Sequence, residues 1–214
     1  MSHTQKIFIQ GAAGNLETLI EPPFISPAKL VGIICHPHPL HEGNMQNKVV
    51  TTVVKVFQRL EITPIRFNFR GVGLSEGVHD YAKGELDDLR SVIHWAKSNY
   101  PDCQLVLAGF SFGSYIATKV ATEVNPVALI TIAPPVHHND FKSLPLIQFP
   151  WVVVQGEADE VVPPDQVFTW IEQLSIKPTL ISMPNVGHFF HGELVTLRDL
   201  LVEKLTPLLP PRAR

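Results

Sequence analysis

The order of predicted strands and helices indicates an α/β fold, with a doubly wound and mostly parallel sheet. Short, continuous apolar segments such as 30–35 and 151–155 are typical of strands that are covered on both faces. Segments with helical periodicity, such as 47–60 and 85–100, separate these strands, as in a parallel sheet with helices on both faces. The chain of 214 residues is long enough for one sizeable core, so we expect a single domain over 1–214.

The first half of the chain predicts a hairpin followed by alternating strands and helices. Residues 6–10 alternate between polar and apolar, 11–15 are turn-like, and 16–20 continue the apolar pattern. Residues 21–27 contain three prolines and are expected to link the hairpin to the next strand. The elements expected next are a strand at 30–35, a helix at 47–60, a strand at 64–69, a glycine-rich loop at 70–77 and a helix at 85–100.

The second half continues the same alternation. The elements expected there are a strand from 104, a helix that follows Gly113, strands at 128–133, 151–155 and 179–183, and helices at 164–174 and 193–205. The loop at 134–150 is rich in proline and histidine. Ligands of such folds bind outside the carboxyl ends of the strands, and the polar clusters of this sequence fall at those ends.

Composition excludes several classes of partner. The formal charge is −3 without a cluster of Lys or Arg, so nucleic acid is not expected to bind. Residues 1–6 lack the apolar core of a signal peptide, and no segment is long enough to cross a membrane. Without a secretory signal, Cys35 and Cys103 are expected to be thiols rather than a disulfide. We therefore expect a soluble, cytoplasmic protein.

The motif Gly109-Phe110-Ser111-Phe112-Gly113 stands between a predicted strand and a predicted helix. A Cβ at either glycine would press on a sharp strand-to-helix turn, so the two glycines favour such a turn. The turn would lift Ser111 above the carboxyl edge of the sheet, at the positive end of the helix. There Ser111 can attack a carbonyl carbon while the amide of Phe112 helps to bind the oxyanion.

A serine hydroxyl needs a base to take its proton and an acid to orient that base. Asp159 follows the predicted strand at 151–155, and His188 follows the predicted strand at 179–183. The order Ser111, Asp159, His188 matches one of the known chain orders of a catalytic triad. The alternatives on the same two loops are Glu157 or Glu160 as the acid and His191 as the base.

Four segments together resemble the α/β-hydrolase superfamily over nearly the whole chain. They are G-F-S-F-G at 109–113, G-E-A-D-E-V-V-P at 156–163, G-H-F-F-H-G at 187–192 and H-P-H-P at 36–39. The chain is most similar to small bacterial members without a lid, which carry C-H-P-H-P-L, N-K-V-V and F-N-F-R-G-V-G-x-S-x-G. This resemblance implies an α/β-hydrolase fold without a cap domain and favours Asp159 as the acid. His41-Glu42-Gly43 departs from the glycine-rich stretch that most of these members have there.

The expected activity is that of a carboxylesterase-like serine hydrolase that needs no cofactor and no metal. It would cleave carboxylic esters or thioesters through an acyl-enzyme. We expect small or short-chain substrates, because the loop at 134–150 is too short for an independent lid. Proline has no N–H, so the amides of His38 and Leu40 are the candidates for the second oxyanion donor, with His38 favoured. The residues expected to contact substrate are Phe110, Phe141, Phe149 and Phe189.

Two other functions compete with this prediction. His36, His38 and His41 have the spacing of the metallo-β-lactamase H-x-H-x-D-H motif, which implies a zinc hydrolase. Leu40 stands where that motif has its acid, and a zinc site leaves G-F-S-F-G unexplained. The second alternative is a catalytically silent hydrolase fold used for binding or scaffolding. The presence of all three triad residue types in order argues against it.

Overall fold

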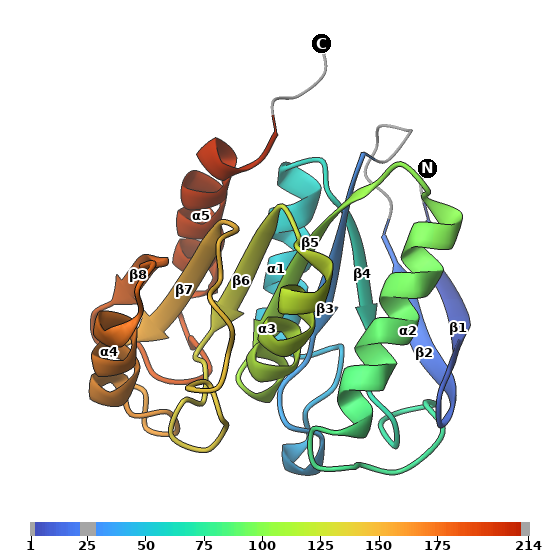
Figure 1. The fold of residues 1–214 in the computed structure, drawn as a ribbon, viewed down its shortest axis with the longest axis horizontal. Coiled ribbons are helices and arrows are strands. Elements are labelled where there is room, and N and C mark those ends of the chain that lie inside the picture. The colour runs from blue at the N-terminus through green and yellow to red at the C-terminus, as the bar shows by residue number, and fades with distance from the viewer. Residues whose placement is uncertain (1–2, 22–28, 211–214) are drawn as a thin grey trace.

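The computed structural model describes residues 3–21 and 29–210. It contains an eight-stranded sheet in the order β1-β2-β4-β3-β5-β6-β7-β8 (Figure 1). The strands are β1 (Gln5–Gly11), β2 (Gly14–Ile20), β3 (Leu30–Cys35), β4 (Thr63–Phe67), β5 (Gln104–Phe110), β6 (Ala128–Ile132), β7 (Trp151–Gly156) and β8 (Thr179–Met183). β2 pairs antiparallel with β1 and β4, and all other pairs are parallel. The prediction of a mostly parallel sheet is confirmed.

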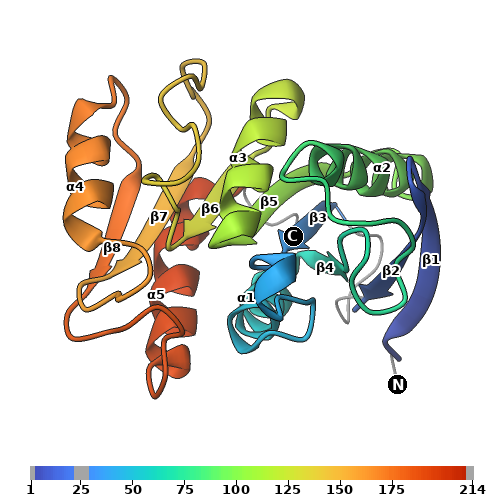
Figure 2. The ribbon, with the colours of Figure 1, turned by 90° about the horizontal axis from the view of Figure 1, so that it is seen from below.

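Helices cover both faces of this sheet. They are α1 (Lys48–Arg59), α2 (Gly84–Asn99), α3 (Phe112–Val124), α4 (Pro164–Gln173) and α5 (Leu194–Leu205), with short 3₁₀ helices η1 (Pro39–His41) and η2 (Thr206–Leu208). Figure 2 shows α1 and α5 on one face and α2, α3 and α4 on the other. Within the described part of the chain, no helix is long and apolar enough to span a membrane.

The strand sequences explain the two cores. Successive side chains of a strand point to opposite faces, so a continuous apolar strand supplies both sides of the sheet. In β5, Leu107 packs with α2 and α3, whereas Val106 and Ala108 pack with α1 and α5. The fold is therefore doubly wound, as the sequence predicts.

One predicted strand ends early, and the reason bears on the site. We expect a strand at 64–69, but β4 ends at Phe67. The amide of Asn68 donates to the carbonyl of Glu17 at 2.9 Å, and the amide of Phe69 donates to Nε2 of His36 at 3.0 Å. The amide of Asn68 thus still bonds to β2, whereas that of Phe69 bonds to a side chain beyond the end of β3. The linker predicted at 21–27 lies, after Glu21, outside the described residues.

The loop at 134–150 contains no helix and no strand. It runs beside α3 and α4 to the amino end of β7 (Figure 2). Phe141, near its middle, is 2% exposed and packs into the core on that face. The loop therefore forms no cap domain.

Candidate active site

Ser111 sits on a strained turn between β5 and α3. Its φ of 51° and ψ of −120° are rare for a residue with a side chain, and such backbone persists only where its surroundings hold it. A Cβ at Gly109 would lie 2.1 Å from the carbonyl oxygen of Gly113, and a Cβ at Gly113 would lie 2.3 Å from that of Cys35. The amide of Ser111 donates to the carbonyl of Ile132 at 2.8 Å, which fixes the turn to β6. Only glycine fits at 109 and 113.

Asp159 and His188 are in direct contact. Nδ1 of His188 lies 2.9 Å from Oδ2 of Asp159, while Oδ1 accepts the amides of Val161 at 2.8 Å and Val162 at 2.7 Å. Burial alone raises the pKa of Asp159, but the hydrogen bonds from His188, Val162 and Val161 outweigh it and hold that pKa below its ordinary value. The carboxylate is therefore ionised and fixed, and Nδ1 of the imidazole donates to it.

Phe110, the last residue of β5, connects Ser111 to the pair of Asp159 and His188. The ring of Phe110 packs against the ring of His188 with centroids 5.0 Å apart, and Phe110 directly precedes Ser111. Among the hydrogen bonds of the described residues there is none between Ser111 and His188. Bonds of this kind are often long in an enzyme without substrate and shorten when substrate binds.

The alternative acids and base have other partners or stand apart. Glu157 is exposed and accepts the hydroxyl of Ser182 at 2.7 Å. Glu160 accepts the backbone amide of His188 at 3.2 Å, so it supports the loop rather than the imidazole. His191 is exposed. The carboxylate–imidazole bond is thus made by Asp159 and His188.

His36 fixes the loop that follows β3. Its side chain is fully buried, with Nδ1 donating to the carbonyl of Pro37 at 2.7 Å and Nε2 accepting the amide of Phe69 at 3.0 Å. Burial lowers the pKa of His36 to about 4, so the ring is neutral near pH 7. Both ring nitrogens are bound to the backbone, which leaves neither for the zinc ion of the metallo-β-lactamase hypothesis.

The same loop lies against the start of α3. A Cβ at Gly113 would meet the carbonyl oxygens of both Cys35 and His36, so these segments touch through their main chains. The rings of His38 and Phe112 lie 5.0 Å apart. The amides of His38 and Phe112, which we expect to bind the oxyanion, therefore belong to adjacent backbone segments.

The amide of Leu40, the alternative oxyanion donor, already has a partner in the structure. It donates to Nδ1 of His38 at 3.2 Å, because the residues around η1 turn back on the His38 ring. The side chain of Leu40 is 62% exposed. This bond favours His38 over Leu40 as the second oxyanion donor, and both assignments stay predictions.

Three of the four phenylalanines expected to contact substrate are not exposed at the Ser111 site. Phe110 is 1% exposed and packs with Phe190, and Phe141 is 2% exposed between Tyr115 and Trp170, so both are core residues. Phe149 lies at the amino end of β7, because the loop at 134–150 returns to that end before the strand begins. Phe189 is 44% exposed beside His188, where a substrate can reach it.

Two histidines that the sequence did not single out lie at the same edge. His137, after β6, is close enough to Asp159 and His188 for their charges to act on it, and its Nδ1 is buried without a partner among the described residues. His79 packs against the rings of His38 and Phe112, with Nδ1 2.9 Å from Oε1 of the fully buried Glu85. The sequence could have indicated His137 as a site residue, because it follows a predicted strand. No pattern in the sequence indicates His79.

Comparison with known proteins identifies the family. A model described as serine aminopeptidase, S33, matches residues 38–145, and a Rickettsia prowazekii protein described as uncharacterised is 34% identical over 197 residues, 86% of this chain and 82% of that protein. An α/β serine hydrolase without a lid from Xanthomonas campestris is 40% identical, with a TM-score of 0.93 over 100% of this chain and 98% of that one. An α/β serine hydrolase homologue from Coxiella burnetii is 46% identical, with a TM-score of 0.92 over 96% and 99%.

The chain therefore belongs to the α/β serine hydrolases. Its fold is that of the members without a lid.

Proposed function

We propose that this chain hydrolyses small or short-chain carboxylic esters or thioesters through an acyl-enzyme on Ser111. The observation that carries the proposal is the 2.9 Å contact between Asp159 and His188, on loops at the same sheet edge as the strained turn of Ser111. Membership of the α/β serine hydrolases supports a hydrolytic reaction, and the absence of a cap supports a small substrate.

The reaction follows from these positions. Oγ of Ser111 attacks the carbonyl carbon while Nε2 of His188 takes the hydroxyl proton, and Asp159 stabilises the imidazolium that forms. The amides of Phe112 and His38 bind the oxyanion. His188 then gives its proton to the leaving alkoxide or thiolate. A water molecule, deprotonated by His188 in turn, attacks the acyl carbonyl. His188 returns that proton to Oγ of Ser111 as the carboxylic acid leaves.

The experiment is covalent labelling with a fluorophosphonate, which reacts with an activated serine. We expect one label per chain, located on Ser111 by mass spectrometry, and no label on Ser111→Ala. The partly exposed Ser91 provides a matched control, because Ser91→Ala removes a hydroxyl on α2 and should label like wild type. A folded protein that does not label would favour the silent scaffold.

The size of the acyl group is tested with p-nitrophenyl esters from acetate to palmitate. Each CH₂ that stays in water forfeits ~0.8 kcal/mol of binding, so an uncovered site gains little from a long chain. We expect kcat/KM to be highest between C2 and C6. A maximum at C12 or beyond would contradict the proposed preference while leaving the labelling result intact.

A further inference from the structure

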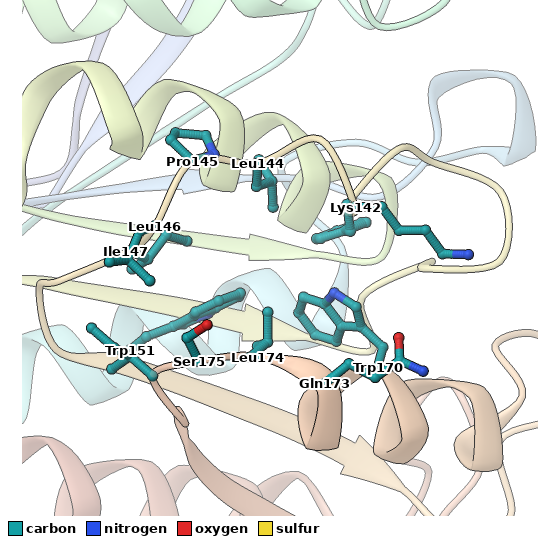
Figure 3. A pocket seen from close by; sticks show the side chains of 12 residues that line it. Lys142, Leu144, Pro145, Leu146, Ile147, Trp151, Trp170, Gln173, Leu174 and Ser175 are labelled. Atoms are coloured by element: carbon teal, nitrogen blue, oxygen red, sulfur yellow. The ribbon is translucent and has the colours of Figure 1, made fainter.

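The largest apolar hollow of Figure 3 does not select a substrate for Ser111. This cavity of about 470 Å³ lies between the loop at 134–150 and α4, and apolar side chains such as Leu146, Ile147 and Trp151 line most of it. Trp151 is the first residue of β7, whereas Ser111 follows the last residue of the parallel strand β5. The cavity is therefore toward the other end of the strands. Side chains that select a substrate must come from the loops at the carboxyl edge.

The imidazole of His38 is held at that edge by three neighbouring rings. Its centroid lies 4.7 Å from that of His41, 5.1 Å from that of His79 and 5.0 Å from that of Phe112. His38 is half-buried among them. The amide of His38 is a proposed oxyanion donor, so the imidazole belongs to a residue that would meet the scissile carbonyl with its own backbone.

A hydrogen bond fixes where the proton of this ring is. Nδ1 of His38 accepts the amide of Leu40 at 3.2 Å, so Nδ1 carries no hydrogen. Burial, together with the neighbouring His41 and His79, lowers the pKa of His38 and outweighs the opposite effect of Glu85. The ring is therefore neutral near pH 7, and its single proton is on Nε2.

Nε2 of His38 is thus a donor to which the protein offers no acceptor. It makes no hydrogen bond among the described residues, and it is not buried, unlike both ring nitrogens of His79. Water can bind it in the free enzyme. A substrate that displaces this water must supply an acceptor or leave the donor unpaired. An unpaired donor typically costs roughly 5-fold to 150-fold in a rate or an affinity, so this N–H can select a substrate.

We propose that Nε2 of His38 donates a hydrogen bond to a second oxygen of the substrate, close to the scissile ester. The inference rests on the proposed hydrolysis at Ser111 and narrows its substrate class. Preferred substrates carry an ether, hydroxyl or carbonyl oxygen on the acyl or the alcohol side, whereas plain alkyl esters are poorer. His38 contacts such a substrate twice, with its amide at the oxyanion and with its imidazole at the second oxygen.

The test compares esters of nearly equal shape that differ by one oxygen. Phenyl methoxyacetate and phenyl butyrate differ on the acyl side, and methoxyethyl butyrate and butyl butyrate differ on the alcohol side. The ratio of kcat/KM within each pair is measured for wild type and for His38→Phe, because the intrinsic reactivity of the esters cancels between the two proteins. We expect His38→Phe to lower the ratio at least fivefold for one pair. The affected pair shows which side of the ester carries the oxygen.

Two further variants show whether the imidazole N–H is responsible. His38→Gln places an amide N–H near the position of Nε2 and should recover part of the lost preference. His41→Phe keeps a ring beside His38 and is the matched control, which should leave both ratios at their wild-type values. Equal ratios in wild type and His38→Phe for both pairs would overturn the proposal. A loss for His41→Phe as large as that for His38→Phe would also overturn it.

A second measurement does not depend on catalysis. Nitrogen NMR of the isotope-labelled chain distinguishes protonated from unprotonated ring nitrogens, and the signals that His38→Phe lacks belong to His38. We expect the proton on Nε2 at pH 7, and a proton on Nδ1 would overturn the proposal even in an active enzyme. Wild type that hydrolyses none of the four esters would contradict the proposed function and this inference with it. Equal ratios in an active enzyme would contradict only the role of His38.

Discussion

His36 and His188 are two buried histidines on loops that follow parallel strands, and they differ in what their nitrogens contact. Both nitrogens of His36 are bound to backbone groups, those of Pro37 and Phe69. Nδ1 of His188 is bound to the carboxylate of Asp159, and no hydrogen bond to its Nε2 is found among the described residues. Both side chains are less than 5% exposed, so burial does not distinguish them.

The difference shows that the partners of a buried imidazole decide its use. The two backbone partners of His36 favour one uncharged tautomer. They leave neither ring nitrogen free to accept a proton from a substrate or nucleophile. An ionised carboxylate fixes Nδ1 as the donor and leaves Nε2 to receive a proton. The proposed chemistry therefore belongs to His188, whereas His36 holds the loop that carries the amide of His38.

The largest effect should come from removing the imidazole of His188. His188→Ala should lower kcat/KM on a short ester by a factor on the order of 10⁴ to 10⁶, because the base and the nucleophile act as a unit. The measurement is steady-state hydrolysis, with circular dichroism to show that the variant folds. His191→Ala removes the exposed histidine three residues later and should keep nearly all activity. The opposite result would make His191 the base.

Asp159→Asn should cost less, on the order of 10⁴, because the carboxylate acts on substrate only through His188. Asparagine keeps an oxygen that can accept the amides of Val161 and Val162, so the loop should survive. Glu160→Gln is the control, since Glu160 accepts the backbone amide of His188 and makes no hydrogen bond to its imidazole among the described residues. A greater loss of kcat for Glu160→Gln than for Asp159→Asn would reassign the acid.

His36→Phe should change stability more than chemistry. It keeps a ring but leaves the amide of Phe69 and the carbonyl of Pro37 buried without partners. Each such group costs about 1–3 kcal/mol, so urea unfolding should show a loss of roughly 2–6 kcal/mol. The same substitution at the exposed His138 should have little effect on the unfolding free energy. An unchanged midpoint for His36→Phe would show that these two bonds contribute nothing net.

The smallest effect is the pH dependence of stability that His36 supplies. Its pKa falls from 6.5 to about 4 on folding, so the unfolded chain takes the proton first as pH decreases. Stability from this group is therefore complete above pH 6.5 and declines as pH falls toward 4, by about 3 kcal/mol in total. The measurement is unfolding in urea at pH 7, 6, 5 and 4 for wild type and His36→Phe. If both lose stability in parallel, His36 is not the cause.

The sequence predicts the elements of this fold well because their causes are local. Apolar segments and helical periodicity locate the strands and helices, and the glycines at 109 and 113 predict the turn at Ser111 because a Cβ at either would clash. The placement of Asp159 and His188 after two strands likewise follows from strand ends meeting at one edge.

The remaining features depend on contacts between distant loops, which no local pattern encodes. The bond from the amide of Leu40 to the ring of His38 depends on how η1 turns, and no pattern in the sequence predicts it. The burial of Phe141 depends on packing against Tyr115 and Trp170, from two different helices. The approach of His79 to Phe112 depends on Glu85 in α2.

The atoms nearest to Gly113 across its contact with the loop after β3 belong to the main chain, and this affects how the protein can evolve. The carbonyls of Cys35 and His36 meet position 113 directly, so the closest approach of the two segments requires glycine there. Other positions on either segment can change without altering that approach, provided that position 113 stays glycine. The side chains that face a substrate can thus diverge over generations while the two amides proposed to bind the oxyanion keep their relative position.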